Sequence, residues 1–550
     1  MEDSLQDNFT VEEKRLINPY FTNLDKPIFA LTNLPEVVKG ALFSRYSRSA
    51  KSLRRVLLDE FIKQPEMGFN EIVGHLAELS GHSSEKGKSQ IVAIKKAEEF
   101  YERVLVGYGD DSVAELGGAS IACEQISQIA AKFIEGARIG ISPLEKSTRY
   151  VWFNQKPDGK YQYYREPVLM DSEFAGIYEE TCDMLFDNYS MLMEPMKKFF
   201  MERFPQEDAS DRAYNSAIRA KVCDVLRVFL PASTLTNVGL YGNGRAFEYL
   251  LTKMYAHPLS EIRNLAKGMN GEFNLVIPSF VKRCDDRYGK SAQEFISGTC
   301  NSVRNFVSEN ISSQPKLSEE VSLADYDNDA EIKVMAGILY PQTNLSMEEA
   351  KHLMQGFSDE KKKELLSAYV SQRKNRRHKP GRAFENCNYQ FDICTNYGIY
   401  RDLQRHRVLT QEAQDLTVVH GYDTPKELCD AGFEKQYHDC MDAVKNTYGE
   451  IYRKFPKEAQ YVVSFGHRIR WYMRMNLREV FHLTELRSMQ QGHPDYRRVA
   501  QKIFLKVKEV HPSLAEGIKF VDMNSYGLER IEAEKKTDKK LDEIRMRFGN

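Results

Sequence analysis

Arg405, His406 and Arg407 stand side by side in the segment RDLQRHRVL, close to the end of a predicted helix. Two guanidinium groups and an imidazole can grip phosphate oxygens or the polar edge of a flavin. Short basic runs are also common at solvated helix ends, so this segment alone leaves both interpretations open. Other motifs of the chain are needed to distinguish these two interpretations.

A second set of polar side chains has helical spacing in NLREVFHLTELR at 476–487. At about 100° per residue, Asn476 and Arg487 lie within about 20° of each other on a helix. Arg478, His482 and Glu485 share a different face. One helix can therefore present different groups to a pyrimidine and to a cofactor. The alternative is an interface helix whose polar groups are satisfied within the protein.

These segments belong to the later of two long, diverged copies in the chain. Arg138 follows Glu115 by 23 residues, and Arg407 follows Glu385 by 22. Each copy closes on Asn-x-Arg at the start of a predicted helix, and each opens on a predicted strand followed by a helix. The paired segments are 27–49 with 321–344 at the openings, and Asn243-Gly-Arg245 with Asn476-Leu-Arg478 at the closing helices.

The elements between these landmarks follow from local patterns. Alternation of Tyr389, Phe391 and Ile393 predicts a strand, and a helix then carries the basic residues at its end. The first copy has an insertion around 155–190, whose polar start NQKPDGKYQYY predicts a hairpin. We predict domains at 1–285 and 319–550, joined by a connection at 286–318 whose SAQEFISGTCNSVRNFV portion is helical.

Composition excludes several classes of protein. A chain of 550 residues with 42% hydrophobic and 28% charged residues is typical of a globular protein of two or more domains. A formal net charge of −2 indicates neither a nucleic-acid nor a membrane-surface protein. No apolar run approaches the roughly 20 residues of a membrane span, and we expect a cytoplasmic protein. Nine cysteines without a C-x-x-C motif indicate reduced structural residues and no metal site.

The R-H-R segment and NLREVFHLTELR resemble the signature and the substrate-activating helix of flavin-dependent thymidylate synthases. The loop Glu145-Lys146-Ser147-Thr148-Arg149-Tyr150 resembles the nucleotide-binding loop of that family. The resemblance covers most of both halves. It implies an α+β fold of two tandem copies, each with an antiparallel or mixed sheet and helices. It also implies methylation of dUMP to dTMP with FAD, NADPH and methylenetetrahydrofolate.

The family's motifs are divided between the two copies. The first copy keeps the nucleotide-binding loop and Arg227, which lies 16 residues before Asn243, but has Gly-Ala-Arg in place of R-H-R. The second copy keeps R-H-R and Arg487, but carries Asp415 in the loop and Gln460 at the position of Arg227. In the family these two halves of a site come from different subunits. We therefore expect composite sites between the copies, and neither copy should work alone.

The resemblance assigns roles residue by residue. Arg487 would be catalytic, stabilising negative charge as the pyrimidine becomes nucleophilic. The substrate would be bound by Glu145, Lys146, Ser147, Thr148, Arg149, Arg227, Asp402 and Arg405. The cofactor would be bound by Arg405, His406, Arg407, Asn476, Arg478 and His482. The run RKNRRHKPGR at 373–382 is either a contact for the FAD pyrophosphate or a solvated loop, and Ser112 is a weaker flavin candidate.

Departures from the family keep alternatives open. Asp402 stands where the family often has Gln, His482 replaces a more usual Asn, and Thr410 and Gln414 follow R-H-R in place of the typical loop. One alternative is a flavoenzyme that modifies another pyrimidine nucleotide, and the other is a non-catalytic nucleotide- or RNA-binding homologue. Two chains would supply four family-like domains, so we predict a homodimer with two working sites. Sites within one chain and sites between chains are equally compatible with the sequence.

Overall fold

The computed structural model describes residues 8–64, 113–313, 315–316 and 319–549. Ser112 lies outside these residues, as do the rest of 65–112 and residues 1–7. The chain forms two compact units. Unit 1 comprises Met1–Glu124, Phe133–Glu145 and Asn237–Ser312, and unit 2 comprises Gln125–Lys132, Lys146–Thr236 and Ser313–Asn550. The predicted nucleotide-binding loop after Glu145 thus belongs to the same unit as the whole of the second copy.

Unit 1 contains a three-stranded sheet in the order β1-β3-β2. Strand β2 pairs antiparallel with β3, with Ile141 opposite Gly242 and Glu145 opposite Val238. The elements of this part of the chain are α1 (Val11–Ile17), η1 (Asn18–Tyr20), α2 (Glu36–Tyr46), α3 (Leu53–Val56), the π-helix η2 (Leu57–Ile62), η4 (Val113–Glu115), β1 (Gly118–Ser127), α6 (Gln128–Glu135), β2 (Ile141–Glu145), β3 (Leu235–Asn243), α11 (Gly244–Tyr255), α12 (Ser260–Phe273), α13 (Pro278–Val281), η7 (Lys282–Cys284) and α14 (Arg287–Asn310).

Unit 2 is built on a four-stranded antiparallel sheet in the order β4-β5-β7-β6. These strands are β4 (Val321–Tyr326), β5 (Asn388–Asn396), β6 (Thr410–Ala413) and β7 (Arg468–Asn476). Tyr389, Phe391 and Ile393 of β5 are fully buried, as are Trp471 and Met473 of β7 to within 2%. The alternation that predicted β5 is confirmed, since a half-buried strand places every second side chain in the core.

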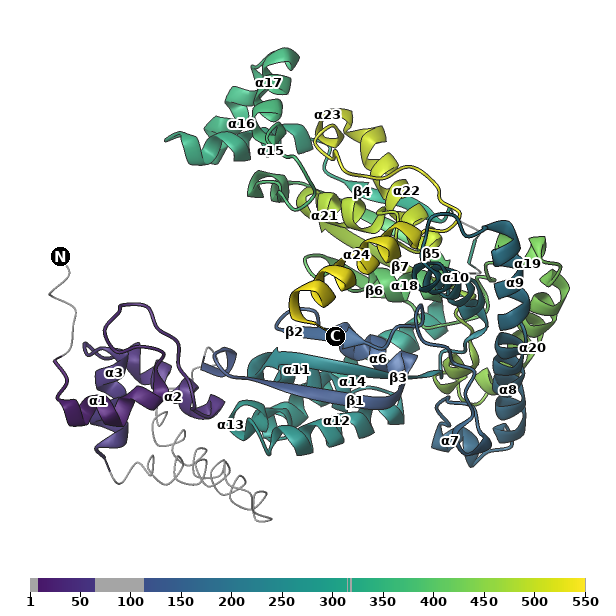
Figure 1. Cartoon of the computed structure of the whole chain (residues 1–550), viewed down its shortest axis with the longest axis horizontal. Helices are drawn as coiled ribbons and strands as arrows, with labels where there is room; N and C mark the ends of the chain where they lie inside the picture. Colours follow the sequence, from purple (N-terminus) through teal and green to yellow (C-terminus); the bar gives the residue numbers. More distant parts are fainter. Residues whose placement is uncertain (1–7, 65–112, 314, 317–318, 550) are drawn as a thin grey trace. The chain divides into compact units, whose positions relative to one another are not determined.

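Helices of unit 2 pack around this sheet, with α21 and α22 beside it and α24 along α10 (Figure 1). They are η5 (Pro157–Gly159), α7 (Pro167–Met170), α8 (Ala175–Met191), α9 (Met193–Arg203), α10 (Asp211–Leu226), η6 (Arg227–Phe229), α15 (Ala330–Leu339), η8 (Tyr340–Gln342), α16 (Met347–Gln355), α17 (Asp359–Val370), η9 (Arg382–Asn386), α18 (Tyr397–Leu403), α19 (Lys426–Asp430), α20 (Glu434–Tyr452), η10 (Glu458–Val462), α21 (Leu477–Arg487), α22 (Pro494–Val510), α23 (Pro512–Ala515) and α24 (Ile531–Phe548). The expected α+β fold class with antiparallel sheets is confirmed.

The two Asn-x-Arg motifs do begin helices, and the asparagine is the reason. Asn243 and Asn476 are N-caps, and their side-chain oxygens accept hydrogen bonds from the backbone N–H of Ala246 and Glu479 at 2.8 and 2.9 Å. An Asn at this position satisfies one of the otherwise unpaired N–H groups of the first turn. The two copies therefore share a strand that runs directly into a capped helix.

The opening segments of the two copies differ. In the second copy, β4 and α15 confirm the predicted strand and helix. In the first copy α2 is present, but the strand predicted before it is wrong, because only Leu31 bridges to Phe21. Arg54 holds the segment instead: it donates to the Lys26 carbonyl at 2.7 Å and lies 3.7 Å from the Phe29 ring centroid.

The hairpin predicted for NQKPDGKYQYY is also wrong. Asp158 and Gly159 take positive φ values of 52° and 77° in the short helix η5, and no strand pair forms around them. The tyrosines of this segment pack against α8, with the Tyr161 and Tyr163 rings 5.0 and 5.9 Å from the Phe186 ring. Burial of the two tyrosines by a helix replaces the expected pairing between strands.

The predicted helical portion of 286–318 is confirmed as α14, whose N-cap Asp286 accepts from two backbone N–H groups. The domain boundaries around it stay a prediction. In the described part of the chain, none of the helices combines the length and apolar character needed to cross a membrane. All nine cysteines are free thiols.

Candidate active site

The R-H-R segment directly follows α18, whose N-cap Asn396 accepts from the Ile399 N–H. His406 is buried, whereas Arg405 and Arg407 are exposed. The two ring nitrogens of His406 face two residues of α21. Nδ1 lies 2.6 Å from Glu479 Oε1, and Nε2 accepts a hydrogen bond from Arg487 Nε at 2.9 Å. The predicted signature and the predicted catalytic arginine are therefore in direct contact.

Arg487 is the last residue of α21. Its guanidinium carbon lies 5.6 Å from the ring centroid of Tyr496 on α22, a cation–π distance. Burial lowers the pKa of Arg487, and the nearby Tyr496 and Asp402 partly oppose this effect. A guanidinium stays charged at neutral pH even so. The structure thus places a desolvated cation beside the R-H-R segment.

The nucleotide-binding loop of the first copy also contacts Tyr496. Arg149 binds Asp224 through two hydrogen bonds of 2.7 and 2.6 Å, and its Nη1 donates to the Tyr496 hydroxyl at 3.3 Å. Burial alone would lower the pKa of Arg149, but the charge of Asp224 outweighs it and raises this pKa. Tyr496 therefore stands between Arg149 of the first copy and Arg487 of the second.

The other residues of the loop have distinct surroundings. Thr148 accepts a hydrogen bond from Arg401 of α18 at 3.3 Å, and Ser147 Oγ accepts the N–H of Arg149 at 3.2 Å. Lys146 is exposed, with its amino group 5.1 Å from the Phe153 ring centroid. Glu145 is buried at the end of β2 in unit 1. Thr148 and Arg149 thus meet the second copy within unit 2, as does Tyr150, whose ring centroid lies 4.3 Å from the guanidinium carbon of Arg530.

Arg227 and Asp402, predicted substrate residues from different copies, form an ion pair of 3.0 Å. Burial by itself would raise the pKa of Asp402, but the positive charges of Arg227, Arg149 and Arg405 hold it well below the usual range. Arg227 Nη2 is buried without a hydrogen-bond partner. Arg149, Arg227 and Arg405 thus lie around two carboxylates, Asp224 and Asp402, and guanidinium groups gathered in this way can recognise an anionic ligand.

Three of the six predicted flavin residues, Asn476, Arg478 and His482, line a different pocket, of about 230 Å³, whereas Arg405, His406 and Arg407 are not among its lining residues. Its basic lining comes from the run at 373–382 and from α21: Arg373, Arg376, Lys379, Arg478 and His482. Arg373 is a structural residue, since it binds both Glu485 oxygens at 3.0 and 2.7 Å. Arg478 donates to the Pro380 carbonyl and to Glu385, at 2.9 and 2.8 Å. Arg478, His482 and Glu485 line one pocket, as the helical spacing indicated, and Asn476, which the spacing grouped with Arg487, lines it as well.

His406, Glu479 and His482 also form a group whose ligand atoms lie within 4.8 Å of one another, the geometry of a possible metal site among the described residues. Cationic side chains of the protein already contact two of these residues. Arg487 donates to His406 Nε2, and Lys379 Nζ lies 3.1 Å from His482 Nδ1. A divalent cation would be repelled by both, so the donor set does not suit a metal.

His482 supports a prediction about pH. Burial, followed by the charges of Lys379, Arg487 and Arg376, lowers the pKa of His482 to about 4. Below about pH 6.5 the histidine of an unfolded chain binds a proton, whereas His482 of the folded protein stays neutral until about pH 4. Protonation therefore favours the unfolded state, and the free energy of unfolding decreases as the pH falls from about 6.5 to 4. His482→Gln should therefore show a smaller decrease of the urea midpoint over this range than the wild type. His352→Gln on α16 is the matched control, and an unchanged slope in His482→Gln would contradict the prediction.

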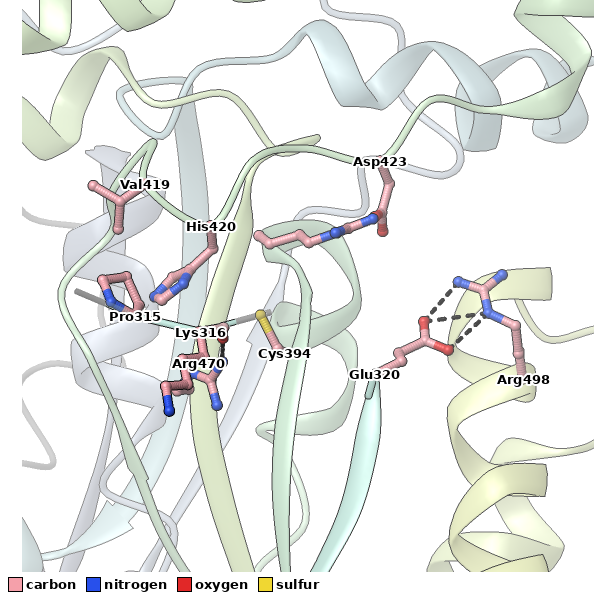
Figure 2. Close-up of a pocket in the computed structure, with 10 residues that line it drawn as sticks. Pro315, Lys316, Glu320, Cys394, Val419, His420, Asp423, Arg470 and Arg498 are labelled. Carbon is pink, nitrogen blue, oxygen red and sulfur yellow. Dashed lines mark hydrogen bonds and ion pairs between the residues drawn. The ribbon is translucent and has the colours of Figure 1, made fainter. Parts of the chain in front are cut away.

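A larger pocket, of about 350 Å³, lies at the opposite end of the same sheet (Figure 2). Arg468, Arg470 and Arg498 line it together with Glu320 and Asp423. Each arginine has a carboxylate partner: Arg468 binds Asp423 at 2.6 Å, Arg470 binds Asp392 at 2.8 Å, and Arg498 binds Glu320 at 2.8 Å. None of the predicted site residues lies there, and its charges are compensated within the protein.

Sequence reasoning missed Asp224, Tyr496, Arg401 and the role of Glu479. Two of them carried a local signal. Asp224 precedes Arg227 by three residues, which places both on one side of the end of α10, and Glu479 directly follows the Asn-x-Arg motif. Tyr496 and Arg401 carried none, because their partners Arg149 and Thr148 are hundreds of residues away in the chain.

The family model for the thymidylate synthase complementing protein matches residues 66–279 and 322–513. The chain belongs to this family. The first match contains the nucleotide-binding loop and the second contains R-H-R and Arg487, so the resemblance inferred from the motifs is confirmed in both halves.

Two relatives match this chain over nearly their full length. A UPF0159 protein of Chlamydia pneumoniae is 42% identical over 539 residues, covering 96% of this chain and 98% of its own. A UPF0159 protein of Thermoplasma acidophilum is 33% identical over 528 residues, covering 90% and 97%. Among solved structures, a UMP/dUMP methylase of Streptomyces cacaoi bound with 5-Br dUMP is 14% identical with a TM-score of 0.29, covering 37% of this chain and 96% of its own.

Proposed function

We propose that the chain is an FAD-dependent enzyme that methylates dUMP to dTMP with methylenetetrahydrofolate and NADPH, at a composite site within one chain. One observation carries the proposal. Arg149 and Thr148 of the retained nucleotide-binding loop contact Tyr496 and Arg401 of the copy that retains R-H-R and Arg487, inside a single compact unit. Family membership and the complementary loss of motifs in the two copies support it.

The substrate side would bind the phosphate of the nucleotide. Asp224 and Asp402 hold the guanidinium groups of Arg149 and Arg227 in place before the nucleotide binds. Arg227 Nη2, buried and without a partner, is a donor that a phosphate oxygen would satisfy. Ser147 and Arg405 would complete this anion site, because charge-assisted hydrogen bonds from several donors are what phosphate recognition requires.

The cofactor side fits an anionic dinucleotide. Arg376, Lys379 and Arg478 line one pocket and would hold the pyrophosphate of FAD, with Asn476 and His482 at the same wall. The flavin, when bound, would supply the reducing hydride that side chains cannot provide. The chain's own contribution is to orient the cofactor and to exclude water from it.

Arg487 would act on the pyrimidine. Its partly buried guanidinium would stabilise the negative charge that develops as the ring becomes nucleophilic. A thiol nucleophile is not part of this chemistry. Burial raises the pKa of Cys182, Cys223, Cys284 and Cys387 to about 12, so these thiols stay protonated at neutral pH.

The purified protein tests the proposal directly. We expect a yellow protein whose flavin absorbance bleaches with NADPH, and tritium release from [5-³H]dUMP that depends on methylenetetrahydrofolate. Colourless protein that does not bleach would contradict the enzyme proposal and favour the non-catalytic nucleotide- or RNA-binding homologue. The predicted homodimer is checked in the same preparation by its mass in solution.

A second candidate substrate, another pyrimidine nucleotide, is favoured by Asp402. This carboxylate, paired with Arg227, occupies the position where the family often has Gln. Growth of a thymidine auxotroph that carries this gene, without added thymidine, would support dUMP. Soluble yellow protein that fails to restore growth would support the other nucleotide.

A further inference from the structure

The contacts of His406 determine which of its nitrogens carries the proton. Arg487 Nε is a donor with no acceptor capacity, so His406 Nε2, 2.9 Å away, must accept and carries no hydrogen. The proton of the neutral ring is then on Nδ1, which donates to Glu479 Oε1 at 2.6 Å. His406 and Glu479 are only 4% and 7% exposed, so water does not compete for these bonds.

The arrangement connects two residues of α21 that cannot meet directly. Glu479 and Arg487 are eight residues apart, about 12 Å along a helix. The side chains of Glu479 and Arg487 cover most of this distance, and the ring of His406, from the segment after α18, lies between them and bonds to both. The backbone N–H of Glu479 donates to the cap residue Asn476 at 2.9 Å. His406 thus links the first turn of α21 to its last residue.

The guanidinium of Arg487 is held on a second side by the Tyr496 ring, 5.6 Å from its carbon. With Nε used by His406, the terminal amino groups are the part of Arg487 that can reach a ligand. Both nitrogens of His406 have partners within the protein. The flavin-binding role expected for His406 would therefore be limited to its ring face.

We propose that His406 and Glu479 are positioning residues: Glu479, together with the Arg487 donor, sets the tautomer of His406, and His406 Nε2 fixes the rotation of the Arg487 guanidinium. The inference rests on the proposed function, in which Arg487 acts on the pyrimidine. Misplacing a reacting group by about 1 Å can cost about 100-fold in rate. Loss of the acceptor at 406 should therefore reduce turnover and leave the binding of flavin and nucleotide largely intact.

Kinetics of three variants test the positioning. His406→Leu removes the acceptor, and we expect kcat to fall about 10- to 100-fold with little change in the KM for dUMP or in flavin content. His406→Gln, whose side-chain oxygen can still accept from Arg487, should recover part of the loss. Thr484→Val, a buried change on α21 between Glu479 and Arg487, is the matched control and should keep the wild-type kcat. Equal kcat values for wild type and His406→Leu would overturn the proposal.

The tautomer can be measured without turnover. In [¹⁵N]histidine-labelled protein at pH 7, with the signal assigned by its loss in His406→Gln, we expect His406 to be neutral with its proton on Nδ1. Glu479→Leu should weaken this preference, because Arg487 alone then opposes a proton on Nε2, whereas Glu479→Gln, which can still accept through its oxygen, should keep it. An imidazolium or an Nε2-protonated ring in the wild type would overturn the inference. The expected tautomer in a protein inactive on dUMP would instead contradict the proposed function alone.

Discussion

Arg487→Lys should lower kcat for dUMP methylation by about 10²- to 10³-fold while flavin binding persists. Removal of one preorganised group that stabilises transition-state charge commonly costs this much. Lysine keeps the positive charge but lacks the Nε–H that binds His406 at 2.9 Å and the planar group that stacks on Tyr496. The loss should therefore come from geometry and hydrogen bonding, with the net charge of the site unchanged.

The measurement is single-turnover methylation per bound flavin, together with NADPH-dependent bleaching. Bleaching should remain near the wild-type rate, because Arg487 does not line the pocket of the predicted flavin residues. Arg497→Lys is a matched control: Arg497 is also buried and binds the Ser488 carbonyl at 2.8 Å, next to Arg487 in the chain. Comparable losses of methylation in both variants would indicate a defect of folding and would contradict a catalytic role for Arg487.

Local patterns in the sequence predicted much of the fold around the site. Alternation of buried aromatic and aliphatic residues identified β5, and asparagines that cap helices marked the starts of α11 and α21. These features are encoded within a few residues of where they act. The same reasoning failed at 27–32 and at 154–164, where Arg54 and Phe186 from other elements decide the conformation. Tertiary contacts override local preference there.

In the candidate site too, local patterns predicted some features and tertiary contacts decided others. The spacing of R-H-R, Arg487 and the nucleotide-binding loop identified the residues, since each motif is short. Among the partners of these residues, Asp224 and Glu479 carried a local signal, but Tyr496 and Arg401 could not be predicted, because folding alone brings them to Arg149 and Thr148. Whether a loop and an arginine far apart in sequence meet in one chain is likewise a property of packing. The contact between Arg149 and Tyr496 within unit 2 supplies that information.

Chains lacking Arg149 and chains lacking Arg487 should not restore each other's activity. If the site is built within one chain, every chain in the mixture has a defective site, and activity stays at the sum of the two variants. Arg149→Ala alone would leave Asp224 as a buried unpaired charge, which costs about 3–5 kcal/mol. Asp224→Asn is therefore combined with it, so that loss of activity is not simply loss of folding.

The two variants are co-expressed with different affinity tags, and complexes that contain both are isolated and assayed for tritium release from [5-³H]dUMP. Wild-type chains co-expressed with a triple variant at 149, 224 and 487 serve as the control, and should keep about half of the activity per chain because each wild-type chain carries a whole site.

Sites between chains would give a different result. One of the two sites in a mixed dimer would then contain both arginines, and substantial activity would return. Such recovery would mean that Arg149 meets a partner chain's Arg487 in the working enzyme.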